Sequence, residues 1–281
     1  MPSPAHLHLI VYSDATQALV GPGWRVLDNR ANPRPDWYEL DPIRRFLRQE
    51  PLDEGAFYGF FSPKFSAKTG LAHEDVLRFV QQHEAEADVM LFSPQPDMGA
   101  FFLNVFEQGE AFDAGLIAAT EALLAHAGRP QRLQALVMDA RQIVFSNYFV
   151  ARPAFWREWL ALCEPLWRVC EGEDEAAPAG LREELTAPTS YRTGEVAAER
   201  KVFVMERMAS LLLATQPRWR SAAHNPFGFG WSVSRFRQHP TEAYISDALK
   251  RAWREQPWPQ YLQAYVTVRE RFRAGSLAPQ P

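Results

Sequence analysis

Polar side chains surround an aromatic one in the segment from Asn104 to Glu110, where amides and a carboxylate flank Phe106. Amides and carboxylates hydrogen-bond hydroxyl groups, and an aromatic ring packs against the apolar face of a sugar ring. In such a site Glu107 would be the general base that takes the proton of an attacking hydroxyl. Asn104 and Gln108 would bind the acceptor, the molecule that carries this hydroxyl. The alternative is a surface loop with Phe106 buried beneath it.

Ser62 and Lys64 follow the continuous apolar run Phe57–Phe61, which predicts a buried strand. In open α/β sheets ligands bind at the carboxyl ends of the strands, so both side chains are candidates for ligand binding. A lysine there can neutralise a diphosphate leaving group without a metal ion. The alternative is an exposed turn lysine. Asn147, between two apolar runs, is either an acceptor contact or a buried, hydrogen-bonded amide.

Composition excludes several other classes of protein. The net charge of −4 and pI near 6.0 argue against a nucleic-acid partner. The sequence contains no dinucleotide-binding or phosphate-loop glycine motif, no zinc spacing and no Gly-x-Ser-x-Gly elbow. Cys163 and Cys170 lie in one helix-like run, too far apart for a disulfide, which favours buried free thiols and a reducing compartment.

The secondary-structure pattern that must position these residues is an α/β one. Strands are predicted at Leu7–Tyr12, Phe57–Phe61 and Asp88–Phe92, with helices between them. A strand pair at 136–139 and 143–150 is predicted next, followed by a helix over 154–170. This alternation predicts a mostly parallel sheet flanked by helices.

The chain divides into three parts by composition. Residues 1–170 form the predicted α/β domain, and the acidic, Pro- and Ala-rich stretch 171–190 is typical of a linker or loop. Residues 191–281 predict a helical C-terminal region packed on it, with helices at 196–214, 241–255 and 261–274. The sequence has neither a signal peptide nor a transmembrane segment, so we expect a soluble cytoplasmic protein, with a peripheral position at the inner membrane as a variant of that location.

Several blocks of the sequence, taken in order, resemble a family of bacterial capsule and O-antigen glycosyltransferases of the GT-A type. Tyr58–Phe65 keeps the family's apolar strand and final aromatic, but Ser62-Pro63-Lys64 stands where the family has His-Tyr-Arg-Arg. The remaining blocks are Leu27–Asn32 with Trp37–Leu40, Ala87–Leu91, Ser146–Phe155 and Met205–Met208.

The resemblance implies a GT-A-like fold, a nucleotide-sugar donor and a glycan or lipid-linked glycan acceptor. It makes the donor the ligand of Ser62 and Lys64. It also places Asp28, Asn29 and Glu39 at the donor pocket, where the alternatives are an Asx turn and a helix start. A metal-binding acid of such a fold would fall at Asp97, which makes Asp97 the candidate catalytic carboxylate and ligand for Mn or Mg. The Asp-x-Asp triplet usual in metal-dependent members is missing.

The implied function is transfer of a sugar to a surface polysaccharide, and the alternative is a catalytically silent binding or scaffolding relative in polysaccharide assembly. Both depend on one expectation about geometry. The carboxyl ends of the early strands should converge on one polar, aromatic-walled cleft that contains Asn29, Lys64, Asp97 and Glu107.

Overall fold

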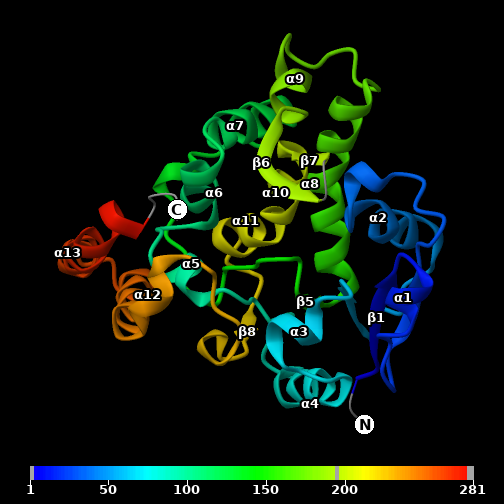
Figure 1. Cartoon of the computed structure of the whole chain (residues 1–281), viewed down its shortest axis with the longest axis horizontal. Coiled ribbons are helices and arrows are strands. Elements are labelled where there is room, and N and C mark those ends of the chain that lie inside the picture. Colours follow the sequence, from blue (N-terminus) through cyan, green and yellow to red (C-terminus); the bar gives the residue numbers. More distant parts are fainter. Residues whose placement is uncertain (1–2, 194–195, 277–281) are drawn as a thin grey trace.

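The computed structural model describes residues 3–193 and 196–276 (Figure 1). At the centre of this part lies a six-stranded sheet in the order β2-β1-β3-β5-β4-β8. Strand β5 pairs antiparallel with β3 and β4, whereas the other pairs are parallel. The mostly parallel α/β sheet is thus confirmed. The bounds are β1 Ala5–Val11, β2 Arg25–Asp28, β3 Phe57–Phe61, β4 Val89–Leu91, β5 Phe149–Ala151 and β8 Ser221–Ala223.

Both faces of the sheet are buried, because successive side chains of a strand point to opposite faces. In β3, Phe60 belongs to one hydrophobic cluster and Phe57 to the other. Helices α3 and α4 cover the second cluster, and α2, α8, α10 and α11 contribute to the first. The helices are α1 Asp14–Gln17, α2 Leu40–Gln49, α3 Phe65–Thr69, α4 His73–His83, α5 Pro96–Ala100, α6 Val105–Phe112, α7 Leu116–His126, α8 Pro153–Glu171, α9 Leu181–Leu185, α10 Arg200–Glu206, α11 Met208–Thr215, α12 Pro240–Glu255 and α13 Pro259–Ser276.

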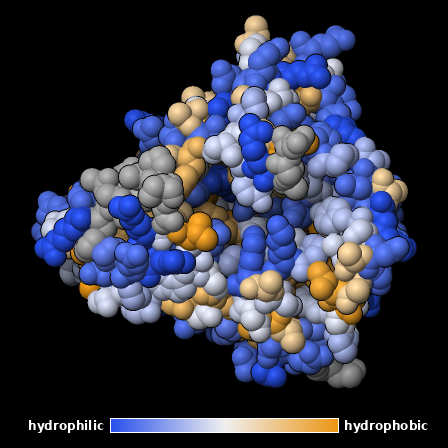
Figure 2. Space-filling model, viewed as in Figure 1, coloured by the Kyte–Doolittle hydropathy of each residue, from blue (hydrophilic) through white to orange (hydrophobic). Residues whose placement is uncertain are grey.

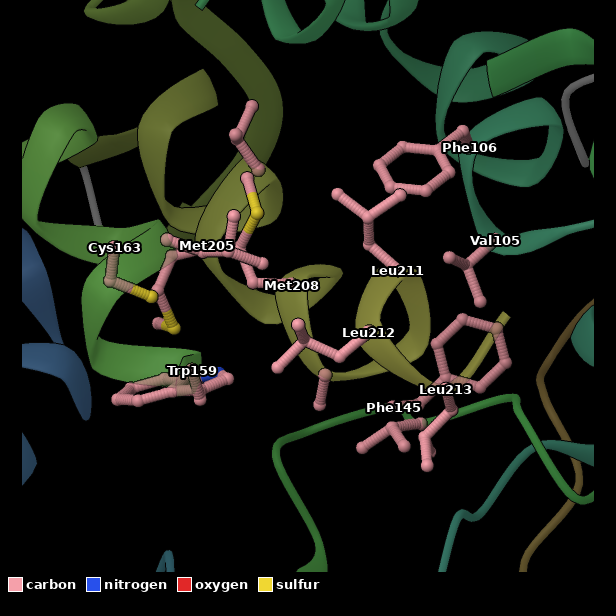
Figure 3. Close-up of a cluster of buried hydrophobic side chains, with 14 of the residues drawn as sticks. Val105, Phe106, Phe145, Trp159, Cys163, Met205, Met208, Leu211, Leu212 and Leu213 are labelled. Atoms are coloured by element: carbon pink, nitrogen blue, oxygen red, sulfur yellow. The ribbon is translucent and has the colours of Figure 1, made fainter. Parts of the chain in front are cut away.

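The larger cluster extends beyond the sheet into a helical layer built around α11. Met208 and Leu211 lie between Trp159 and Cys163 of α8 on one side and Phe106 of α6 on the other (Figure 3). All five side chains are buried. Burial also raises the pKa of the Cys163 thiol well above its usual range, as expected for a free thiol used in packing. This layer fixes the positions of α6 and α8.

The last third of the chain differs from the helical region expected over 191–281. Its strand β8 joins the central sheet beside β4. The segment 196–199, expected to be helical, forms strand β7 (Val196–Glu199), which pairs with β6 (Pro188–Thr193) in a hairpin. The expected linker over 171–190 contains α9 and the start of that hairpin. Helices α12 and α13 lie where helices were predicted.

The strand pair expected over 136–139 and 143–150 is also mostly absent from the described residues, where only 149–151 pair as a strand. Ser146 and Asn147 both adopt the left-handed conformation, which interrupts an extended chain. None of the helices in the described ranges combines the length and the apolar character that crossing a bilayer requires.

Candidate functional site

A cleft of about 1150 Å³ opens at the carboxyl ends of the parallel strands. Tyr12 follows β1, Ser62 follows β3, and Asn147 lies just before the antiparallel strand β5, so all three are at one edge of the sheet. The space-filling view is hollowed near its centre, below the β6–β7 hairpin (Figure 2). Other walls come from α1, α3, α6, α10 and the hairpin, with the apolar side chains Leu19, Phe112, Leu116, Phe145, Tyr191, Val196, Val202, Phe203 and Met205.

Backbone strain is concentrated at this cleft. Five non-glycine residues of the described chain have positive φ, between 36° and 59°. All five line the cleft: Asn32, Tyr38, Gln95, Ser146 and Asn147. Such conformations cost about 1–3 kcal/mol each and persist where the surroundings enforce them, which is typical of binding and catalytic sites.

The loop that carries Tyr38 into the cleft is anchored by Trp37. The indole of Trp37 is fully buried and stacks on Trp167 of α8, with ring centroids 4.8 Å apart. Its Nε1 donates to Glu171 at 2.9 Å, and the ammonium of Lys201 lies 4.5 Å from its ring. Because Trp37 is held on three sides, the next residues of the loop have a fixed position at the cleft wall.

Two lysines give the cleft a positive side. The ammonium of Lys68 donates to Ser146 Oγ at 2.9 Å and lies 5.7 Å from the ring of Tyr148. Lys64, one turn earlier at the start of α3, is exposed, and its ammonium has no hydrogen bond or ion pair within the described ranges. Lys64 is therefore available to an anionic ligand.

Most carboxylates at the cleft are engaged by neighbouring groups. Asp36 accepts from Arg34 at 3.0 Å and from Lys201 at 2.7 Å. Asp113 forms a bidentate pair with Arg200 through distances of 2.8 and 2.9 Å. The three remaining cleft carboxylates are Glu39, Glu199 and Glu206.

Glu199 pairs with Lys201, and Glu206 accepts the backbone N–H of Ser146. Glu39 has no such partner: its carboxylate makes no hydrogen bond or ion pair with another of the residues described. Burial, and the nearby charge of Glu206, raise the pKa of Glu39 above its ordinary value, with Lys64 and Lys68 acting in the opposite direction. Protonation of Glu39 is thus favoured relative to that of an exposed glutamate.

Five of the residues predicted from the sequence line this cleft. They are Glu39, Ser62, Lys64, Gln108 and Asn147. The Gln108 amide oxygen accepts from Arg207 at 2.6 Å. The Asn147 side chain is buried, its amide nitrogen contacts the sulfur of Met205, and its amide oxygen has no hydrogen-bond partner in the described part of the chain.

The other candidates for the donor pocket lie outside the cleft lining. Asp28 is exposed and binds Arg30, with the shortest distance 2.7 Å, and this pairing holds the pKa of Asp28 at about 2. Asn29 is buried, donates to Asn32 at 3.2 Å and accepts from Arg45 at 2.5 Å. Both residues shape the turn after β2, which corresponds to the Asx-turn alternative.

Asp97 is completely buried at the start of α5. One of its oxygens accepts the backbone N–H of Ser232 at 3.0 Å, and the other accepts the hydroxyls of Ser232 and Ser234. These bonds use both oxygens and tie α5 to the loop before α12. A carboxylate so engaged and enclosed does not fit the role of an Mn or Mg ligand, so no step is derived through a metal. Within the described ranges, no group of three or more His, Cys, Asp or Glu side chains could hold a metal ion.

Asn104 and Glu107 form the start of α6 rather than a cleft wall. The Asn104 side chain accepts the N–H groups of Phe106 and Glu107 and donates to two backbone carbonyls. Glu107 accepts the backbone N–H of Leu103 and binds Arg269 of α13 at 3.1 Å. The expected cleft therefore exists, but of Asn29, Lys64, Asp97 and Glu107 only Lys64 lines it.

Cleft residues that were not singled out for a site from the sequence include Tyr12, Lys68 and Glu206. Tyr148 shares a 2.6 Å hydrogen bond with Ser62, and burial raises the pKa of both Tyr148 and Tyr12. A signal for Lys68 was present, because Lys64 and Lys68 are spaced to share one face of a helix. The others come together only through the fold.

Comparison with protein-family models, with curated proteins and with solved structures finds no match for this chain.

Proposed function

We propose that the cleft binds a nucleotide-activated sugar and transfers the sugar to a glycan of a bacterial surface polysaccharide, as the GT-A resemblance implies. The observation that carries this proposal is the unpaired ammonium of Lys64 at the carboxyl end of β3. It lies at the mouth of a cleft whose volume, about 1150 Å³, suits a ligand of nucleotide-sugar size.

The chemistry follows from where charge develops. Transfer leaves a nucleoside diphosphate, and its negative charge is stabilised by a positive group already in place. Lys64 supplies that group and Lys68 adds a second positive charge nearby. Ser62 and Asn147 offer hydrogen bonds to hydroxyls, and aromatic walls such as Tyr191 and Phe203 offer flat surface to a sugar ring.

The test is titration of UDP-, GDP-, CMP- and dTDP-sugars by calorimetry and thermal shift, with and without manganese. A donor at 100 times its Kd should add about 2.7 kcal/mol of stability. Lys64→Ala should weaken that donor at least tenfold, whereas Arg78→Ala, which removes an exposed positive charge on α4 outside the cleft, should not. Absence of binding by all donors, or equal affinity of the Lys64 variant and wild type, would overturn the proposal.

A second candidate is a binding module of the same ligand class that does not catalyse transfer. It is favoured by the structural engagement of Asp97 and Glu107, the two carboxylates to which the sequence assigned catalysis. Donor binding without release of the nucleotide would support this candidate.

A further inference from the structure

Glu39 occupies an unusual position among the cleft carboxylates. Asp36, Asp113, Glu199 and Glu206 each have an ion-pair or hydrogen-bond partner, as described above. Glu39 has none from another described residue, although its side chain is half-buried in the cleft wall. A carboxylate held in such a wall without a partner is destabilised in its charged form and is ready to take up a proton.

The position of Glu39 is fixed by its neighbours in the sequence. Trp37 is anchored against α8, Tyr38 is forced to φ 48° and ψ −121°, and the α2 helix begins directly after Glu39. A strained residue between an anchor and a helix start leaves little freedom for the side chain that follows. Backbone strain is therefore located directly before Glu39, the residue whose side chain lines the cleft.

The charged groups that act on Glu39 come from two elements, α10 and α3. Glu206 at the end of α10 opposes its ionisation, and Lys64 and Lys68 of α3 favour it. The charge of Glu39 also contributes to raising the pKa of Tyr12, after β1, and of Tyr148, before β5. Glu39 therefore shares one electrostatic environment with the two lysines that would face the diphosphate.

We infer that Glu39 is the general base of the transfer, an inference that rests on the proposed function. The acceptor hydroxyl oxygen forms a bond to the anomeric carbon while its proton passes to the Glu39 carboxylate. The bond from the anomeric carbon to the phosphate oxygen breaks, and its electron pair leaves with the nucleoside diphosphate beside Lys64. A single displacement of this kind inverts the anomeric configuration.

The experiment uses the full chain and whichever nucleotide sugar binds in the titration above, with water as acceptor and nucleotide release as readout. Glu39→Gln should keep donor Kd within about threefold of wild type and lower the release rate by about 10²- to 10⁴-fold. Glu107→Gln, the same change outside the cleft, should leave the rate unchanged. The wild-type rate should rise with pH through an apparent pKa above that of an ordinary glutamate, and this rise should disappear in Glu39→Gln.

Glu39→Asp keeps a carboxylate but withdraws it, so it should fold as wild type and recover part of the rate. An undiminished rate in Glu39→Gln, or a product of retained configuration, would overturn the role of Glu39 while leaving the proposed function intact. A wild-type protein that binds the donor but releases no nucleotide would overturn the role of Glu39 and support the second candidate, the binding module. If no donor binds, the proposed function itself fails.

Discussion

The hydroxyl oxygens of Ser62 and Tyr148 lie 2.6 Å apart, and both side chains are buried. Ser62 comes directly after β3 and Tyr148 directly before β5, so this bond links the ends of two neighbouring antiparallel strands at the cleft. Asn147, which adopts φ 54°, is adjacent to Tyr148. The bond helps to hold this left-handed turn, and with it the cleft wall, in place.

Tyr148→Phe should destabilise the protein by about 1–2 kcal/mol, because it leaves the buried Ser62 hydroxyl without its partner. The measurement is urea unfolding of the two single variants, Tyr148→Phe and Ser62→Ala, and of the double variant. A coupling energy of about 0.5 kcal/mol or more is expected. Strict additivity of the two single changes would show that the bond contributes nothing to stability.

Asp97→Ala should cost about 2–4 kcal/mol, since it leaves the Ser232 N–H unpaired and removes the acceptor of the Ser232 and Ser234 hydroxyls. Asp97→Asn should cost much less, because its amide oxygen can still accept the Ser232 N–H while its NH₂ group donates to the hydroxyls. Thermal unfolding measures both variants. Donor affinity should stay unchanged in Asp97→Asn with or without manganese, and a selective loss of affinity with manganese would restore Asp97 as a metal ligand.

Glu107→Gln should reduce stability by about 1 kcal/mol or less, because it weakens the pairing of α6 with Arg269 of α13. The new amide oxygen can still accept the Leu103 N–H. Chemical denaturation and nucleotide release should be measured on the same preparation. A tenfold or larger loss of the nucleotide-release rate at unchanged stability would show that Glu107 takes part in the reaction.

His8 should make the protein less stable in mild acid. Burial, with a smaller contribution from the charge of Arg25, lowers the pKa of His8 to about 4, from an ordinary value of 6.5. Between these pH values His8 is protonated in the unfolded chain and neutral in the folded chain. The free energy of unfolding therefore falls as the pH decreases from 6.5 to 4 and then levels off. The contribution of His8 at pH 5 is about 2 kcal/mol relative to pH 7.

The pKa values of His6 and His224 are also lowered, so these histidines add to the acid sensitivity of the protein. Replacement of His8 by Leu separates the contribution of His8 from theirs. Urea unfolding at pH 7 and pH 5 should show a smaller pH-dependent loss in His8→Leu than in wild type. An identical loss in the two proteins would exclude His8 as a source of the acid sensitivity.

The sequence predicts the buried strands and long helices well, because their signals are local. Phe57–Phe61 is apolar throughout and is a strand with the same bounds in the structure, and the helix predicted over 154–170 appears as Pro153–Glu171. Strand β8, Ser221–Ala223, has small residues and only three positions, so only its pairing with β4 defines it. The predicted strand over 143–150 is mostly lost because Ser146 and Asn147 turn the chain.

The candidate site is predicted only in part because polar residues also serve local structure. Asn104 and Glu107 were assigned to a site, although they have the spacing of a helix cap. That spacing alone favours a structural role at a helix start. Asp97 depends on Ser232, a partner distant in sequence that no local pattern reveals. Lys64 and Ser62 were found because a position at a strand's carboxyl end is readable from the sequence.

Strand β8 has a consequence for how the chain matures during synthesis. Among the described residues it pairs with β4 alone, from the first third of the chain, so that edge of the sheet stays open until residues near 221 have left the ribosome. Until then the free edge of β4 can pair with another nascent chain. A shortened protein that stops at residue 170 would keep this edge permanently and would also lack the helices shown in Figure 3 around Met208, so it should aggregate rather than fold.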